Sequence, residues 1–450
     1  MARTSSMFLI IKEAIGEMKL NKDETNFSEE TLSEIPDRVI TKLISNLNNL
    51  SDERHKAYVK YPVQEIMFIS FFAVLANANN WIEIGNFAKR KKEWIGYFFD
   101  VSNGVPSHDT IQRVLTLIKP DELHSLMSAY IIDVITELEQ LALEISENKK
   151  ELKELLDEKN ILSIDGKINR GSSRENTIDG KVAPLNTLSA YSSKYGMSLG
   201  QEYIAEKTNE IPAAPELIGK LNIRETIVTW DALNTQKETV KAVIKGKGDY
   251  VAALKGNHHS LYEDVKLYFD EVVTKDLEQK ENCYKKTEEK AHSNIEKREY
   301  YITEDIKWLS QKKEWAGLKS IAYEKKTIYK SNGEIAEEKR YYITSLKEDV
   351  ELLAKAVRSH WQVENNLHWQ LDFTFKEDAN TTLEKKGAKT LSVIKRNVLT
   401  LLQLVKEYYK MSMSLIRYNI SLDFEEGVAE LFELLDIEKL RQAYEEINKK

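Results

Sequence analysis

Three acidic residues, Asp165, Asp231 and Glu364, have the settings expected of a metal-dependent active site. Asp165 follows the mostly apolar run of residues 161–164 and Asp231 follows that of residues 227–230, so each is predicted at the end of a buried strand. Glu364 is predicted on the apolar, core-facing stripe of a helix, where an unpartnered carboxylate would cost on the order of several kcal/mol. Hard divalent ions prefer carboxylate oxygens, so three converging acids predict a metal site.

The elements that must position these acids follow from periodicity. At steps of three and four, the stripe that includes Glu364 consists of Val350, Leu353, Val357, Trp361, Glu364, His368 and Leu371. A helical pattern at residues 235–244 and a strand pattern at 250–254 follow Asp231, which places this acid in a β-α-β context. Ligands of open α/β sheets usually bind at such strand ends.

The order of predicted elements between residues 161 and 254 indicates the fold class. Three strands come first, with Gly196 in a hairpin turn between the second and third, and two α/β units follow. This order is typical of a ribonuclease H-like mixed sheet, which places its acids on the first and fourth strands and on a late helix. We therefore predict an α/β protein with a ribonuclease H-like catalytic domain.

The chain is predicted to contain several regions. The prediction comprises a polar extension (1–35), a helical domain (36–155), a catalytic domain in two segments (156–256 and 348–410), a β-rich insertion (257–347) and a helical tail (411–450). The 133 positions between Asp231 and Glu364 are far more than one sheet crossover needs, and Asn332-Gly333 is a strong hairpin signal inside them.

Composition excludes several classes of protein. The 450 residues are 42% hydrophobic, which is enough for two or three domains with a sizeable core. A single cysteine, Cys283, excludes an internal disulfide framework and suits a reducing compartment, and the apolar run 66–76 is too short to span a bilayer, so we expect a cytoplasmic protein. With a net charge of −8, any nucleic-acid surface must be local; the basic runs at 89–92 and 385–396 are candidates, or plain solvated helix faces.

Several motifs resemble those of a known family, the H-repeat-associated bacterial insertion-sequence transposases of the DDE superfamily. The matching segments are GVPSHDT at 104–110, DGK at 165–167, EKTNEIP at 206–212, VTWDALNTQ at 228–236, LKGN at 254–257, HWQVENNLHW at 360–369 and LDFTFKED at 371–378. They occur in the right order from about residue 40 to beyond residue 400. The chain departs from the family at residues 291–296, which read AHSNIE in place of GHGRIE, and at His258 in place of a glutamine.

The resemblance implies a helical transposase-associated domain followed by a catalytic domain with Asp165, Asp231 and Glu364 as the DDE triad. It also implies a divalent cofactor, normally Mg²⁺ with Mn²⁺ able to substitute, and double-stranded DNA as partner, both as the ends of a mobile element and as target. A homodimer in a synaptic complex is the implied assembly. This chain lacks the arginine of the GHGRIE motif, and with it one possible contact to the DNA backbone.

Further residues near the triad are candidates for DNA contact. They are Lys167, Arg170, Lys207, Asn209, Lys255, Asn257, Arg298, Arg358, His360, Asn365 and His368. The basic ones among them would make binding sensitive to salt if they met phosphates, or they could be surface ion-pair partners. Trp361 and Trp369 could stack on a splayed DNA end, but core packing is the better interpretation of both.

Three functions remain open on the sequence. The first is a DDE transposase that cuts at terminal inverted repeats and joins the freed 3′-hydroxyl ends to target DNA. The second is a metal-dependent nuclease of the same fold without strand transfer. The third is a catalytically inactive, transposase-derived DNA-binding protein.

Overall fold

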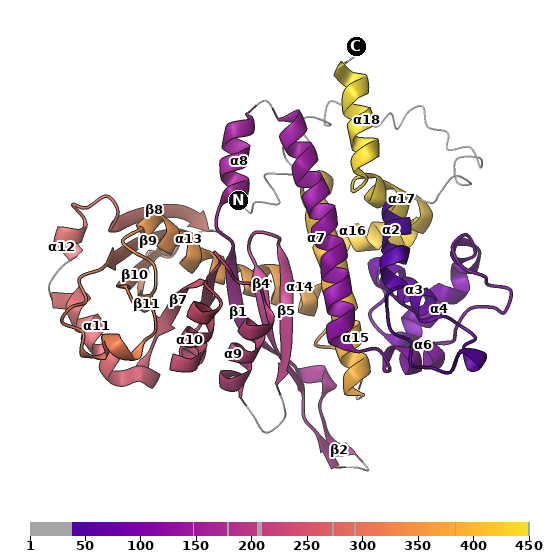
Figure 1. Ribbon diagram of the computed structural model, residues 1–450, viewed down its shortest axis with the longest axis horizontal. Coiled ribbons are helices and arrows are strands. Elements are labelled where there is room, and N and C mark those ends of the chain that lie inside the picture. The colour runs from indigo at the N-terminus through magenta and orange to yellow at the C-terminus, as the bar shows by residue number, and fades with distance from the viewer. Residues whose placement is uncertain are drawn as a thin grey trace.

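The computed structural model describes residues 38–146, 148–177, 180–204, 209–271, 274–291, 294–382 and 384–448. The predicted extension, residues 1–35, lies outside the described residues. The molecule is a mixed α/β protein in which one large sheet lies beside a helical part (Figure 1). The predicted α/β class is therefore confirmed.

The sheet has nine strands in the order β5-β4-β1-β6-β7-β11-β10-β9-β8. The five strands of this sheet that come first along the chain are β1 (Ile161–Asn169), β4 (Leu185–Ser192), β5 (Met197–Ile204), β6 (Ile227–Trp230) and β7 (Asp249–Leu254). Between β1 and β4 in the chain, β2 (Arg174–Thr177) and β3 (Gly180–Val182) form a separate two-stranded sheet. β1 pairs in parallel with β6 and antiparallel with β4, and β6 pairs in parallel with β7. Helices α9 (Glu210–Lys220) and α10 (Lys237–Lys245) form the two crossovers. The predicted order of three strands and two α/β units is confirmed, including the antiparallel β4–β5 hairpin with Gly196 at φ 65°.

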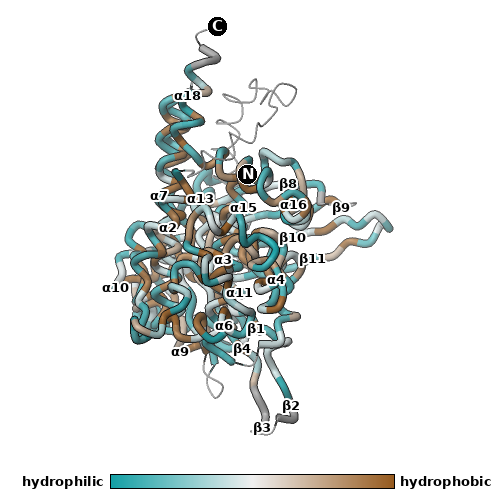
Figure 2. The backbone as a smooth tube through the Cα atoms, turned by 90° about the vertical axis from the view of Figure 1, so that its right-hand side faces the viewer, coloured by the Kyte–Doolittle hydropathy of each residue, from teal (hydrophilic) through white to brown (hydrophobic). Residues whose placement is uncertain are grey.

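The segment between β7 and Glu364 supplies the other four strands. They are β8 (Tyr284–Ala291), β9 (Asn294–Thr303), β10 (Ser320–Tyr329) and β11 (Ile335–Thr344). β11 pairs antiparallel with β7, so the segment extends the same sheet, which the sequence did not predict. The predicted hairpin at Asn332-Gly333 joins β10 to β11 with Gly333 at φ 84°, and its hydrophilic tip stands out from the body (Figure 2). Helices α11 (His259–Glu271) and α12 (Thr274–Leu277) precede these strands.

The helical part draws on both ends of the chain. From the first half come α2 (Arg38–Leu47), α3 (Val63–Leu75), α4 (Trp81–Arg90), α5 (Lys92–Ile95), α6 (His108–Leu115), α7 (Pro120–Ile145) and α8 (Lys149–Asp157). From the second half come α15 (Lys385–Tyr409), α16 (Met413–Leu422), α17 (Phe424–Glu433) and α18 (Ile437–Asn448). One hydrophobic core joins the two sets. Nearly every residue of α3 is buried, as the apolar run 66–76 predicts for a core helix, and no helix among the described residues is long and apolar enough to cross a membrane.

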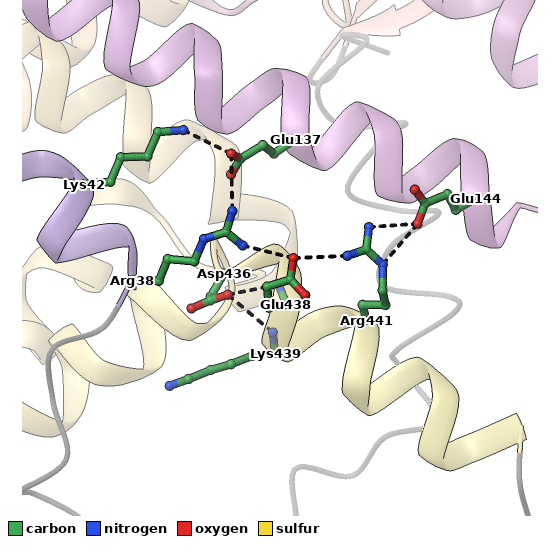
Figure 3. Close-up of polar contacts among 8 residues, drawn as sticks. All are labelled: Arg38, Lys42, Glu137, Glu144, Asp436, Glu438, Lys439 and Arg441. Carbon is green, nitrogen blue, oxygen red and sulfur yellow. Dashed lines mark hydrogen bonds and ion pairs between the residues drawn. The ribbon is translucent and has the colours of Figure 1, made fainter. Parts of the chain in front are cut away.

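A charged network fastens the last helix to the first ones (Figure 3). Arg38 on α2 pairs with Glu438 on α18 at 3.1 Å, and Arg441 on α18 pairs with Glu144 on α7 at 3.0 Å. Asp436 accepts hydrogen bonds from the first backbone N–H groups of α18 and so caps it. Exposed ion pairs of this kind contribute at most about 1 kcal/mol each, so the apolar core, rather than these charges, holds the two ends of the chain together.

Candidate active site

Neighbouring strands bring Asp165 and Asp231 together. β1 and β6 are parallel with Ile164 opposite Trp230, and each aspartate is the next residue along its strand. Asp231 caps a short 3₁₀ turn, with its Oδ1 accepting from the backbone N–H and the side-chain Nδ2 of Asn234, each at 3.3 Å. Asp165 differs from the prediction in one respect. It lies within β1, which continues to Asn169 by pairing with β4 after its parallel partner β6 has ended.

The prediction that Glu364 faces the core is wrong. Helix α13 (Val350–His360) is followed by a π-helical turn, Val363–His368, and then by α14 (Trp369–Phe373). The wider turn shifts the helical phase, so Val363 and Leu367 are buried while Glu364 is exposed. Single π turns of this kind are frequent at functional sites, and this one turns the carboxylate out of the core.

Glu364 nevertheless lies within electrostatic reach of Asp165. Partial burial raises the pKa of Glu364, the negative charge of Asp165 raises it further, and His368 opposes both effects. His368 Nδ1 lies 3.3 Å from Asp165 Oδ2, so the π turn contacts strand β1 directly. The structure thus places Asp231 on the strand next to Asp165, and Glu364 within electrostatic reach of Asp165.

His360 links the helix to the strands behind the acids. It is half-buried, its Nδ1 lies 3.3 Å from Thr229 Oγ1, and Thr229 Oγ1 donates in turn to Ser163 Oγ at 3.2 Å. Burial lowers the pKa of His360, while Asp165 and Asp231 oppose that effect. These contacts make His360 a packing link between α13, β1 and β6.

A fourth carboxylate, Glu210, lies at the same place and was missed by the sequence reasoning. Its Oε2 accepts from Asn234 Nδ2 at 3.1 Å, the same amide that contacts Asp231. Burial raises the pKa of Glu210, and the negative charges of Asp231 and Asp165 add to that rise. A Cβ at Gly166 would collide with the Glu210 carboxylate, so the glycine after Asp165 makes room for it. Gly166 is therefore the sequence feature from which the close approach of a further side chain to Asp165 could have been predicted.

The acids fit a divalent cation in their chemistry. Asp165 and the three carboxylates near it, Asp231, Glu364 and Glu210, concentrate negative charge, and hard cations such as Mg²⁺ take oxygen ligands. Two buried polar atoms at the site, Asn234 Oδ1 and His368 Nε2, have no hydrogen-bond partner within the described part of the chain. In that same part, no group of three or more His, Cys, Asp or Glu side chains is already arranged as a complete metal site.

Two of the predicted DNA-contacting residues are committed to internal ion pairs. Lys167 is buried and its Nζ lies 2.6 Å from Asp372 and 3.4 Å from Glu377. Arg298 is also buried; it pairs with Glu289 at 3.4 Å and with Glu296. Neither side chain presents its charge to DNA in this arrangement.

The remaining candidates divide by exposure. Arg170, Lys255 and Asn365 are exposed, whereas the half-exposed Arg358 pairs with Glu289 at 2.8 Å. The side chain of Asn209 caps α9, and Asn257 Nδ2 donates to the Ala232 carbonyl at 2.7 Å. Lys207 lies outside the described residues, as do His292 and Ser293 of the altered 291–296 motif.

Comparison with known proteins places the chain in a family. Residues 157–401 match the model described as "Transposase DDE domain", and residues 44–131 match the model described as "DDE_Tnp_1-associated". The chain belongs to the DDE transposases. It is 31% identical over 373 residues to "Putative transposase YncI" of Escherichia coli O157:H7, covering 82% of this chain and 89% of that protein. It is 30% identical over 373 residues to "H repeat-associated putative transposase YhhI" of E. coli K12, covering 80% and 91%.

The predicted family is thereby confirmed, and with it the assignment to DNA transposition by an insertion-sequence element. The matched DDE domain of this transposase contains Asp165, Asp231 and Glu364, and such domains generally use divalent metal ions. A solved structure, "Cryo-EM structure of piggyBac transposase synaptic complex with hairpin DNA (SNHP)", aligns with a TM-score of 0.35 at 10% identity over 97% of this chain and 81% of that one. That likeness is too low to support an argument about this transposase.

Proposed function

We propose that this transposase cuts DNA at the terminal inverted repeats of an insertion sequence and joins the freed 3′-hydroxyl ends to target DNA. The observation that carries the proposal is the convergence of Asp165, Asp231 and Glu364, from two adjacent parallel strands and a π turn, inside the matched DDE domain. We further infer that strands β5-β4-β1-β6-β7 with their crossover helices form a ribonuclease H-like unit, because their order and pairing agree with the order predicted for that fold.

In this proposal the three acids would hold Mg²⁺, or Mn²⁺ in its place, with Asp165 as the shared ligand because it lies on the strand next to Asp231 and its charge acts on Glu364. A bound pair of such ions would supply activation of the attacking water or 3′-hydroxyl and stabilisation of the leaving oxygen. His368 orients Asp165 through the 3.3 Å contact, and Asn234 fixes Asp231. The same site serves cleavage and joining, so no covalent intermediate with the protein is needed.

DNA would reach the acids along residues that are open to it. Arg170, Lys255 and Asn365 are the exposed candidates retained for contact with the substrate, since Lys167 and Arg298 are paired internally and the His368 side chain is largely buried against Asp165. Each phosphate contact made by a basic side chain would add about 0.9 to the magnitude of the slope of log K for DNA binding against log salt concentration. We also propose that the transposase acts as a homodimer that holds two DNA ends in one synaptic complex.

The test is a cleavage and joining assay on the inverted repeats that flank the gene, with Mg²⁺ present. We expect the parent protein to cut and join these ends, and Asp165→Asn to bind them without cutting. Cutting without joining would instead identify a nuclease, and specific binding without any Mg²⁺-dependent cutting by the parent would identify an inactive DNA-binding derivative. Undiminished cleavage by Asp165→Asn would contradict the assignment of the site.

A further inference from the structure

Two large aromatic side chains stand exposed beside the acids. Trp369 and Phe373 are 52% and 53% exposed, and their rings stack with centroids 4.7 Å apart and planes 12° from parallel. They occupy positions i and i+4 of α14, so one helical turn separates them and the stack lies along the helix surface. The prediction that Trp369 packs in the core is therefore wrong, because the π turn changes which face of the helix meets the core.

A cation lies against this aromatic pair. Lys376 Nζ is 5.1 Å from the centre of the Phe373 ring, and the Lys376 side chain is exposed. Lys376 has φ 51°, a left-handed conformation that is uncommon for a residue other than glycine and marks a locally constrained backbone. The turn at Lys376 thus brings a positive charge back to the ring that ends the helix.

The pair also lies next to the catalytic acids. Trp369 follows His368, whose Nδ1 contacts Asp165 at 3.3 Å. It comes five residues after Glu364, which corresponds to about 7.5 Å along a helix axis. Successive nucleotides of a DNA strand are about 3.4 Å apart, so the rings are roughly two nucleotides from the acids.

We propose that Trp369 and Phe373, with Lys376, form a stacking platform for an unpaired base of the DNA substrate next to the phosphodiester that is cut. Every nucleobase has a π face, and base–aromatic stacking combined with a nearby cation is the usual way in which proteins hold single-stranded nucleic acid. The Lys376 ammonium meets the phosphate of the same nucleotide. This inference rests on the proposed DNA-cutting function and adds what the site does with the strand end.

A second exposed aromatic stack provides a matched control. Trp308 is 42% exposed and stacks on Tyr268 with centroids 5.0 Å apart and planes 14° from parallel. The acidic residue Asp305 lies beside it, accepting hydrogen bonds from Trp308 Nε1 at 2.8 Å and from the Tyr268 hydroxyl at 3.5 Å. An acidic neighbour disfavours a phosphate, so this stack should not bind DNA.

The test uses the full-length protein in an Asp165→Asn background and two DNA probes. One probe is a 20-base-pair duplex with a three-nucleotide single-stranded extension that contains 2-aminopurine, and the other is a fully paired duplex of the same sequence. We expect binding to quench the 2-aminopurine fluorescence of the extended probe. Trp369→Ala and Phe373→Ala should each abolish most of the quenching and weaken binding of the extended probe about tenfold. Binding of the paired probe should change less than twofold.

The controls separate stacking from other causes. Trp369→Phe should retain most of the quenching, and Trp308→Ala should behave as the parent on both probes. Full quenching and parental affinity in Trp369→Ala would overturn the proposal. It would also be overturned if sedimentation showed a changed oligomeric state for Trp369→Ala while the quenching stayed at the parental level. Cleavage by the parent protein and by Asp165→Asn is measured in a separate assay. If that assay contradicts the catalytic assignment, the fluorescence result still tests the stacking platform independently.

Discussion

Replacing Lys167 with methionine distinguishes a buried structural cation from a DNA contact. The Lys167 side chain is 5% exposed and its ammonium lies between Asp372, Glu377 and the Asn169 side-chain oxygen, at 2.6, 3.4 and 2.7 Å. These contacts tie strand β1, which carries Asp165, to the segment that follows the π turn of Glu364. Lys167→Met should therefore loosen both the fold and the catalytic geometry.

The loss in free energy of unfolding expected for Lys167→Met depends on the two carboxylates, Asp372 and Glu377, that lose their partner. Removing one member of a buried ion pair costs about 3–5 kcal/mol, because the other charge stays buried without compensation. Glu377 keeps a hydrogen bond from Ser392 at 2.5 Å and the nearby charge of Arg396, and Asp372 is 41% exposed, which favours the lower end of that range. We expect Lys167→Met to lower the free energy of unfolding by about 3 kcal/mol and to reduce cleavage strongly.

The assay combines urea unfolding with DNA binding over a range of salt concentrations. Lys255→Met is the matched comparison, since Lys255 is exposed just after β7 and is retained as a DNA contact: its replacement should cost less than about 0.5 kcal/mol in unfolding but lower the magnitude of the slope of log K against log salt by about 0.9. If Lys167 instead contacts a phosphate, Lys167→Met should lower the magnitude of the slope of log K for DNA binding against log salt concentration by about 0.9. The free energy of unfolding should then be unchanged. That result would refute the ion-pair reasoning.

Three further variants probe the same region. Gly166→Ala should fold normally but lose at least about tenfold in Mg²⁺-dependent cleavage, because its Cβ displaces the Glu210 carboxylate; parental activity would exclude Glu210 from the site. Burial lowers the pKa of Lys395 to about 8, so its charged form destabilises the fold below pH 8, and this penalty fades as pH rises toward 10.5. Lys395→Met should thus gain up to about 3 kcal/mol in urea unfolding at pH 7 and little near pH 10.5. Arg417→Met should markedly lower the thermal unfolding midpoint, since it removes the guanidinium donors to the Ala78 and Thr374 carbonyls, at about 1–3 kcal/mol each, and two further bonds to Val74, which keeps its backbone donor Asn77; an unchanged midpoint would contradict this.

Local patterns were sufficient to predict the strands that carry the two aspartates. A short apolar run followed by an acid is enough to place Asp165 and Asp231, and Gly196 and Gly333 mark hairpins that depend only on neighbouring residues. The face of Glu364 could not be predicted in the same way. The π turn depends on distant packing, such as the hydrogen bond from Gln403 Nε2 to the Asn366 carbonyl at 2.7 Å.

Partners that are distant in the chain account for the other differences. A lysine two residues after a catalytic aspartate is consistent with a phosphate contact until Glu377, 210 positions later, is known to lie beside it. The Glu210 carboxylate was visible only as part of a motif, because its approach to Asp231 requires the crossover helix α9 to be in place. The joining of β11 to β7 likewise needs the whole sheet, since periodicity predicts strands but not which strands pair.

The most direct test of the central claim is anomalous diffraction from crystals of the transposase grown with Mn²⁺. We predict an anomalous peak at bonding distance from Asp165 and from at least one of Asp231 and Glu364, and its loss in Asp165→Asn. Mn²⁺ bound elsewhere, with these three carboxylates unliganded at saturating metal, would contradict the account.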